Sequence, residues 1–410
     1  MTTDVIVVGG GAAGLFAAGE AAEAGKRVLL LEKNERLGKK LYITGKGRCN
    51  VTNDCTSEEV LQNVPRGGKF LYSAITAFPP AKMMALLERL GCPLKTERGN
   101  RVFPVSDRAQ SVIDALQSRL RRGGVRVERA NVTAILTEDG RATGVQTDLG
   151  AFAAPGVIFC PGGCSYPLTG SDGSGYALLR QLGHTIAEPA GSLVPLEEEG
   201  DWCAQMQGLS LRNVGVKLVS QKGKPLFSDF GELLFTHFGL SGPTILSASA
   251  HRRVGEICRI EIDLKPALDE QKLDQRFLRD FEKYQNRTFE NALGDLFPRT
   301  MIPVIVARSG IPGETRVNSV TKEQRRALLL LTKRFTVEIR GPRPVAEAIV
   351  TSGGVRLSEV NPRTMESKLV QGLYLAGEIL DADAYTGGFN LQIAWATAYA
   401  AASAVAGLTE

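Results

Sequence analysis

The 410-residue sequence lacks the features of membrane and secreted proteins. No stretch approaches the roughly 18 consecutive apolar residues that a membrane-spanning helix needs. The first residues are apolar only from Val5 to Val8 before glycines interrupt them, which does not fit a signal peptide. We therefore expect a cytoplasmic protein that contacts no membrane.

The sequence also lacks paired cysteines and clustered metal ligands. Its seven cysteines are odd in number and scattered, which predicts reduced thiols in an intracellular protein and no bound metal. There is no G-x-S-x-G nucleophile elbow and no kinase-type phosphate loop. These absences argue against a disulfide scaffold, a metalloenzyme, a serine hydrolase of the elbow type and a kinase.

The composition is that of a soluble globular protein, with 43% hydrophobic and 23% charged residues. The length predicts two or three domains. The net charge of +5 favours anionic ligands only weakly and does not by itself indicate nucleic-acid binding. The 45 glycines gather in short clusters after apolar runs, as in loops whose backbone approaches a ligand closely.

The N-terminal 32 residues predict a dinucleotide-binding β-α-β unit. Gly9, Gly11 and Gly14 form G-x-G-x-x-G between an apolar strand and a small-residue helix. These glycines permit, in turn, the tight turn, the approach of backbone to a pyrophosphate and close helix–strand packing. Residues 28–31 form the second strand, and Glu32 follows it, placed to accept hydrogen bonds from ribose hydroxyls. An acid there repels a 2′-phosphate, so FAD or NAD is favoured over NADP at this site.

The rest of the chain predicts a dinucleotide-binding domain built from both chain ends around an insertion. The predicted elements are a helix over 106–120, strands at 125–127, 132–136, 144–147, 157–160, 214–219 and 258–264, a turn at 221–224, a largely helical stretch over 268–333, a strand-glycine-helix segment at 373–378, and a final helix from Leu391.

Several longer motifs resemble a bacterial family of NAD(P)/FAD-dependent oxidoreductases. They span residues 40–53, 161–173, 235–243, 351–355, 361–367 and 375–392. The resemblance implies an α/β fold with a Rossmann-type, glutathione-reductase-like FAD domain over 1–190 and 345–410. It also implies an inserted β-barrel-like domain over 191–266 and 334–344, with a helical insertion over 267–333.

The resemblance implies tightly bound FAD. No second strand-G-x-G-x-x-G-helix unit follows, so NAD(P)H is expected only as a transient co-substrate. Gly377, Glu378 and Asp381 would approach the ribityl and phosphate portion, and Gly387 and Gly388 would open the last helix beneath the isoalloxazine ring or form only a turn. The remaining expected FAD-binding residues are Ala13, Lys33, Lys40, Gly45, Arg48, Cys49, Asn50, Val132 (adenine contact or ordinary strand residue), Gly162, Gly163, Asn390 and Leu391.

Three residues are candidates for catalysis. Cys49 and Cys55 have the spacing C-x5-C, which is not that of related disulfide reductases, so Cys49 is either a single general acid near the flavin or a packing residue. Tyr166 is either a hydrogen-bond donor at the ring or structural, and His237 lies in a Gly/Ser/Pro-rich loop. Arg48, with Lys46, could also hold the FAD pyrophosphate or an anionic substrate.

The resemblance favours a reductase in which NAD(P)H reduces FAD and reduced FAD reduces a conjugated C=C bond. The substrate would be uridine C5=C6 in ribosomal RNA or the enone of a steroid or bile acid. Basic residues of the helical insertion, including Arg325, Arg326, Lys333 and Arg334, mildly favour RNA, although such charges usually form a solvated face. The alternatives are an amine oxidase that uses O₂ and a flavin-binding redox sensor.

Overall fold

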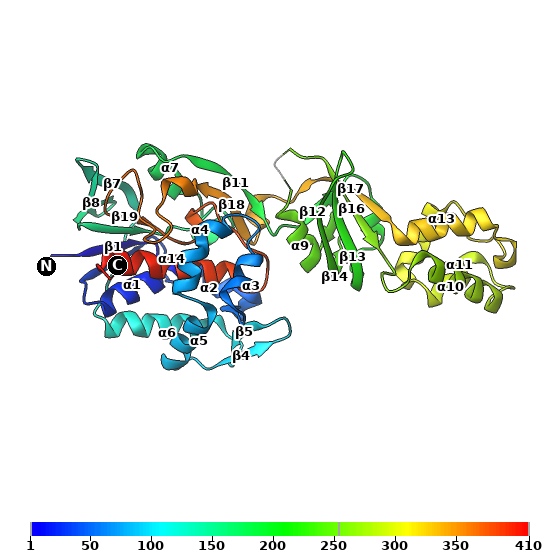
Figure 1. The fold of residues 1–410 in the computed structure, drawn as a ribbon, viewed down its shortest axis with the longest axis horizontal. Helices are drawn as coiled ribbons and strands as arrows, with labels where there is room; N and C mark the ends of the chain where they lie inside the picture. The colour runs from blue at the N-terminus through cyan, green and yellow to red at the C-terminus, as the bar shows by residue number, and fades with distance from the viewer. Residues whose placement is uncertain (1, 253–254, 409–410) are drawn as a thin grey trace. The chain divides into compact units, whose positions relative to one another are not determined.

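The computed structural model describes residues 2–252 and 255–408. The chain forms two compact units (Figure 1). Unit 1 comprises Met1–Ser192 and Val345–Glu410, and unit 2 comprises Leu193–Pro344. The dinucleotide motif at the N-terminus and the glycine-rich segment near the C-terminus therefore belong to the same unit.

A five-stranded parallel sheet organises unit 1. Its order is β19-β10-β1-β2-β6, with the bounds β1 (Val5–Val8), β2 (Val28–Glu32), β6 (Arg126–Arg129), β10 (Gly156–Phe159) and β19 (Leu373–Leu375). Val8 lies opposite both Leu31 and Phe159, and Phe159 lies opposite Leu375. The carboxyl ends of the strands thus meet at one edge, where open α/β sheets bind their ligands.

Two alanine-rich helices cover this sheet close to the motifs. Helix α1 (Ala12–Glu23) packs against helix α14 (Phe389–Val405), so the first and last helices of the chain lie side by side (Figure 1). Small side chains allow this close approach, and most residues of both helices are buried. Helix α6 (Ala109–Arg122) packs on α1 and begins later than the predicted Ser106, since Asp107 has a φ of 53° and cannot continue a helix.

Smaller sheets and helices complete unit 1. The sheets are β3-β5-β4, β7-β8-β9 and β11-β18. The bounds are α2 (Lys39–Ile43), β3 (Thr52–Asn53), α3 (Ser57–Gln62), α4 (Gly68–Ala77), α5 (Pro80–Arg89), β4 (Leu94–Glu97), β5 (Arg101–Pro104), β7 (Val132–Glu138), β8 (Arg141–Thr147), β9 (Gly150–Ala153), α7 (Ser174–Gln181), β11 (Ile186–Ser192) and β18 (Val350–Val355), with short 3-10 turns between them.

Unit 2 contains a closed six-stranded barrel and a set of helices. The barrel order is β12-β15-β14-β13-β16-β17. The bounds are β12 (Leu196–Glu198), α8 (Trp202–Gln205), β13 (Ser210–Ser220), β14 (Pro225–Phe235), β15 (Gly239–Ser241), α9 (Pro243–Ser249), β16 (Cys258–Asp263), α10 (Glu270–Lys283), α11 (Phe289–Ala292), α12 (Ile302–Ser309), α13 (Lys322–Lys333) and β17 (Phe335–Pro342). Barrel and helices share one hydrophobic core.

Across residues 2–252 and 255–408, no single helix is long and apolar enough to cross a membrane. Helices α4 and α5 pass that test of length and composition only as a pair, and the pair is bent by 41°.

Candidate functional site

The N-terminal glycines form a cradle whose shape depends on the absence of side chains. A Cβ on Gly9 would strike the carbonyl oxygen of Cys160, and one on Gly14 would strike the carbonyl oxygen of Gly9. A Cβ on Gly11, by contrast, would meet no protein atom within 4 Å. Gly9 and Gly14 are thus required by the fold itself, whereas Gly11 borders the open space in front of helix α1. The helix N-terminus presents unpaired N–H groups to that space, which suits a pyrophosphate.

Glu32 closes the cradle on the second strand. Its Oε2 accepts a hydrogen bond from the Gly10 N–H at 2.6 Å, and its Oε1 accepts two from Asn34, each at 2.7 Å. The side chain is largely buried, so these donors fix the carboxylate at the end of β2. Each carboxylate oxygen can accept more than one hydrogen bond, and Glu32 therefore retains capacity for ribose hydroxyls.

An ion pair joins four segments at the predicted ribityl region. Lys40 Nζ lies 2.6 Å from Glu378 Oε2 and donates to Ser165 Oγ at 2.6 Å. Glu378 Oε1 accepts from the Thr351 N–H at 2.8 Å and from the Ser165 hydroxyl at 2.9 Å. Burial is the largest influence and would raise the pKa of Glu378, but the charge of Lys40 and the hydrogen bonds from Lys40, Thr351 and Ser165 together outweigh it and hold that pKa below its usual range. The segments at 40, 165, 351 and 378 are thereby fixed around one carboxylate.

The segment from Asp381 to Gly388 is shaped by side chains that flank it. Asn390 accepts from the Ala384 N–H at 2.9 Å and donates to the Ala384 carbonyl at 2.7 Å. Gly388 caps α14 with a φ of 102°. Asn53 donates to the Gly387 carbonyl at 3.1 Å. No side chain of the described residues caps the N-terminus of α14, and a helix N-terminus favours negative charge.

Asn50 and Cys49 differ in whether their polar atoms are available to a cofactor or substrate. The Oδ1 atom of Asn50 is buried and has no hydrogen-bond partner among the described residues. Buried polar groups normally have a partner, so this orphaned atom fits a site that holds a polar ligand. The Cys49 thiol is fully enclosed, and burial raises its pKa to about 12. A general acid must contact its substrate, and this enclosure favours the packing role of Cys49.

Arg48 is engaged in ion pairs rather than presented to a phosphate. Its guanidinium donates to Asp107 at 2.7 Å, pairs with Glu97, and lies 4.1 Å from the centre of the Phe103 ring. These carboxylates raise the pKa of Arg48. Two carboxylates thus compensate the charge of Arg48 in this structure, and its role in holding a pyrophosphate or an anionic substrate stays a prediction.

The other residues predicted to bind FAD also lie in unit 1. Lys33 pairs with Asp172 at 2.8 Å, which ties the segment after Gly170 to the end of β2. Gly162 and Gly163 leave no room for a side chain, because a Cβ would strike the hydroxyls of Ser171 and Thr351. The remaining ones are Ala13 at the start of α1, Gly45 with a φ of 57°, Val132 at the start of β7, Gly377 after β19 and Leu391 in the first turn of α14.

The other two catalytic candidates lie in different units. Tyr166, in unit 1, is 36% exposed and has a φ of 52°, which is unusual for a bulky residue and costs about 1–3 kcal/mol. His237, in unit 2, is exposed and forms an edge contact with Phe238, the ring centres being 5.0 Å apart. Both side chains are accessible, so either could meet a substrate.

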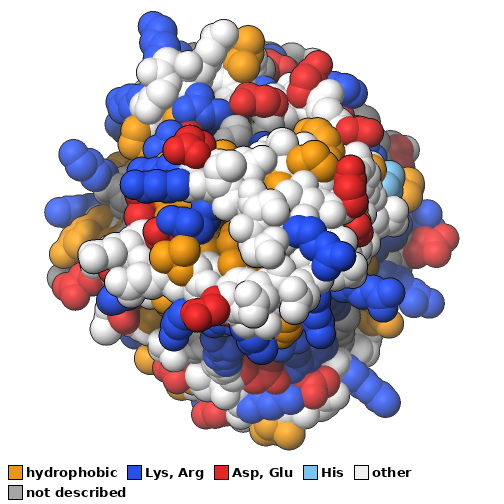
Figure 2. Space-filling view, turned by 90° about the vertical axis from the view of Figure 1, so that its right-hand side faces the viewer, with side chains coloured by type: hydrophobic (Ala, Val, Ile, Leu, Met, Phe, Trp, Pro, Cys, Tyr) orange, Lys and Arg blue, Asp and Glu red, His pale blue; other side chains and the backbone are white. Residues whose placement is uncertain are grey.

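The four basic residues of the helical insertion that favoured RNA are paired with acids. Arg325 pairs with Asp274, Arg326 with Glu270, Lys333 with Asp263 and Arg334 with Glu261. Figure 2 shows Lys and Arg side chains interspersed with Asp and Glu on the face turned to the viewer. The four residues that favoured RNA therefore do not form an uncompensated basic stripe.

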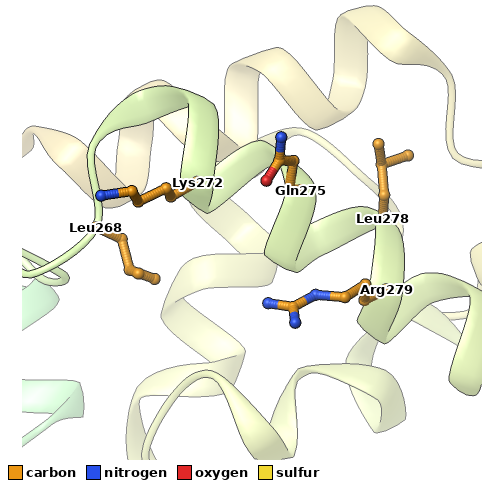
Figure 3. A pocket seen from close by; sticks show the side chains of 5 residues that line it. All are labelled: Leu268, Lys272, Gln275, Leu278 and Arg279. Atoms are coloured by element: carbon orange, nitrogen blue, oxygen red, sulfur yellow. The ribbon is translucent and has the colours of Figure 1, made fainter.

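An open hollow of about 490 Å³ lies on helix α10 (Figure 3). It is lined by Leu268, Lys272, Gln275, Leu278 and Arg279. Leu268 precedes α10, and the other four residues lie on that helix. All five belong to unit 2, whereas the dinucleotide cradle lies in unit 1. Among the described residues, no group of three or more His, Cys, Asp or Glu side chains could hold a metal ion.

Comparison with known proteins agrees with an FAD site. A family model described as HI0933-like protein Rossmann domain matches residues 3–404. The chain is 32% identical over 407 residues to a 3-dehydro-bile acid delta(4,6)-reductase of Clostridium scindens, covering 98% of each chain. It is 29% identical over 406 residues to a ribosomal RNA dihydrouridine synthase of Escherichia coli, covering 97% of each.

The fold is also found among solved structures. A 3-ketosteroid delta1-dehydrogenase from Sterolibacterium denitrificans, solved with 1,4-androstadiene-3,17-dione, has a TM-score of 0.53 at 14% identity and covers the whole of both chains. At this identity the similarity concerns the fold alone.

Proposed function

The chain belongs to the HI0933-like family of FAD-binding Rossmann proteins and is an FAD-dependent oxidoreductase, and from this premise we propose that it reduces a C=C bond conjugated to a carbonyl group. One observation carries the proposal: two relatives similar over nearly the full length have names that specify this type of reduction, one on a bile acid and one on uridine. The chemistry common to both is reduction of an electron-poor alkene.

In this proposal the residues of unit 1 hold the cofactor. The α1 N-terminus and the open side of Gly11 would receive the pyrophosphate, and Glu32 would accept hydrogen bonds from the ribose. The Lys40–Glu378 pair would fix the region of the ribityl chain, and the α14 N-terminus would face the negatively charged edge of the ring. Bound FAD, reduced by NAD(P)H, would supply the hydride that adds to the alkene.

The neighbouring carbon must also receive a proton. We infer that the donor is an accessible side chain, which favours Tyr166 or His237 over the enclosed thiol of Cys49. Between the two substrate classes, the ion-paired cations of the helical insertion favour a small enone over RNA, since paired charges release fewer counterions from a phosphate backbone.

Anaerobic stopped-flow mixing of the holoprotein with NADH or NADPH tests the first half of the proposal. Rapid loss of the oxidised flavin absorbance is expected with at least one nucleotide. A flavin that stays oxidised with both contradicts an NAD(P)H-linked reductase. Reduction by an amine, followed by peroxide release in air, would instead support the amine oxidase. A gel shift with ribosomal RNA at two salt concentrations separates the substrate classes, because RNA binding weakens steeply with salt.

A further inference from the structure

The sequence motif at residues 361–367 ends in a buried hydrogen-bonded relay that the proposed reaction does not use. Ser367 Oγ lies 3.0 Å from His184 Nε2, and His184 Nδ1 lies 3.2 Å from Glu359 Oε2. The His184 side chain is 0% exposed, and Ser367 is also buried. The order Ser–His–Glu resembles a hydrolase triad, but a serine buried in this way cannot meet a substrate.

The donors and acceptors of the relay are satisfied only when the imidazole is neutral. Ser367 Oγ accepts hydrogen bonds from the Leu369 N–H at 3.1 Å and the Val370 N–H at 3.0 Å, so both of its lone pairs are used. Its proton is therefore donated to His184 Nε2. The Nδ1–H then donates to Glu359, whose Oε2 also accepts from the Thr185 N–H at 2.9 Å.

A protonated imidazole does not fit this arrangement. It would place an Nε2–H against Ser367 Oγ, which has no lone pair left, and would leave the serine proton without an acceptor. Glu359 lies in the segment after β18 and faces His184. Its carboxylate partly stabilises the protonated imidazole. The other charged neighbours on the Ser367 segment point elsewhere: Glu366 accepts from the Gly372 N–H, and Lys368 donates to the Ser358 carbonyl.

The relay supports the strand that leads into the FAD site. The Ser367 N–H donates to the Leu373 carbonyl at 2.7 Å, and the Leu375 N–H donates to the Met365 carbonyl at 2.9 Å. Strand β19 has only three residues and lies at the edge of the sheet, so residues 361–367 supply the partners on its free side. Gly377 and Glu378 follow β19 after a single residue, Ala376.

We propose that the His184–Ser367 contact is an acid-sensitive latch that holds β19 and the FAD-binding residues after it, and that opens when the imidazole takes up a proton. Burial lowers the pKa of His184 despite the neighbouring Glu359. The closed latch therefore binds fewer protons than the open one, and opening becomes easier as pH falls below about 6.5, the usual value for histidine. One proton changes the opening equilibrium at most about tenfold per pH unit.

The test measures the release of FAD from the holoprotein between pH 7.5 and 5.5, with the fluorescence of free FAD as the readout. The sequence contains only three histidines, which makes the substitutions unusually selective. Wild-type protein is expected to release FAD with a slope approaching tenfold per pH unit below pH 6.5. H184Q should release more FAD at pH 7.5 and lose that slope. H251Q is the matched control, because His251 lies in unit 2 and contacts Phe227, and it should behave as wild type.

An unchanged slope in H184Q overturns the proposal. Histidine NMR on the wild-type holoprotein gives a second test that needs no folded variant. The buried imidazole should stay neutral until FAD leaves and should titrate together with its release. A ring that titrates near pH 6.5 while FAD remains bound also overturns the latch. Neither result depends on the substrate or on the reductase reaction.

Discussion

Two glycines of the same motif should fail for different reasons when replaced by alanine. A Cβ on Gly11 meets no protein atom within 4 Å, and its φ of −78° suits any residue. Gly11→Ala should therefore change the stability of the protein without FAD by no more than about 1 kcal/mol, since the gain from a less flexible unfolded chain offsets the weaker helix cap. Gly14→Ala places a methyl group on the Gly9 carbonyl and should cost roughly 3 kcal/mol or more.

The effect of Gly11→Ala should appear in FAD affinity. If the methyl group displaces two hydrogen bonds to the pyrophosphate, each worth about 1.5 kcal/mol or more, the loss is roughly 100-fold in Kd. Urea unfolding of the FAD-free variants and fluorescence titration with FAD measure the two quantities separately. A Gly11→Ala variant that binds FAD like wild type would show that the pyrophosphate does not lie over Gly11. A Gly14→Ala variant of normal stability would refute the packing argument.

Two further predictions concern buried groups of the site. Lys40→Met leaves Glu378 without its partner and should cost roughly 3 kcal/mol at pH 7 in urea unfolding. The direction in which the free energy of unfolding changes with pH should also reverse. In wild type the lowered pKa of Glu378 gives stability that is present above about pH 4.5 and lost below it, whereas in Lys40→Met burial dominates and stability falls as pH rises above 4.5. Equal pH profiles for the two proteins would contradict this. The Cys49 thiol, with its pKa raised to about 12, should resist iodoacetamide at pH 8 until the protein unfolds; rapid labelling of the native protein by mass spectrometry would show that the thiol is accessible.

The local patterns of the sequence predicted the parts of the fold that depend on neighbouring residues. The glycine spacing and the apolar runs located β1, α1 and β2, because turn geometry and burial act within about 30 residues there. Strands near 132, 157, 214, 258 and 373 were located for the same reason. Helices α4 and α5 were not predicted, although their buried residues form part of the unit 1 core.

The partners of the site residues could not be predicted, because they are distant in sequence. Ser165 and Thr351 complete the Lys40–Glu378 pair from segments more than a hundred residues from Lys40. Arg48 illustrates the same limit, since its partner Asp107 follows it by 59 residues. The residue type of Arg48 and the motif around it predicted a positively charged site. Only the fold determines whether that charge remains available to a ligand.

We propose above all that this oxidoreductase delivers a hydride to an alkene conjugated to a carbonyl. The most direct test is to reduce the holoprotein photochemically without oxygen and add a steroid enone or uridine-containing RNA, following the flavin spectrum and the product mass. We expect one of the two substrates to restore the oxidised flavin and to gain two mass units. A flavin that remains reduced with both substrates, yet is reoxidised at once by O₂ with peroxide release, would contradict it.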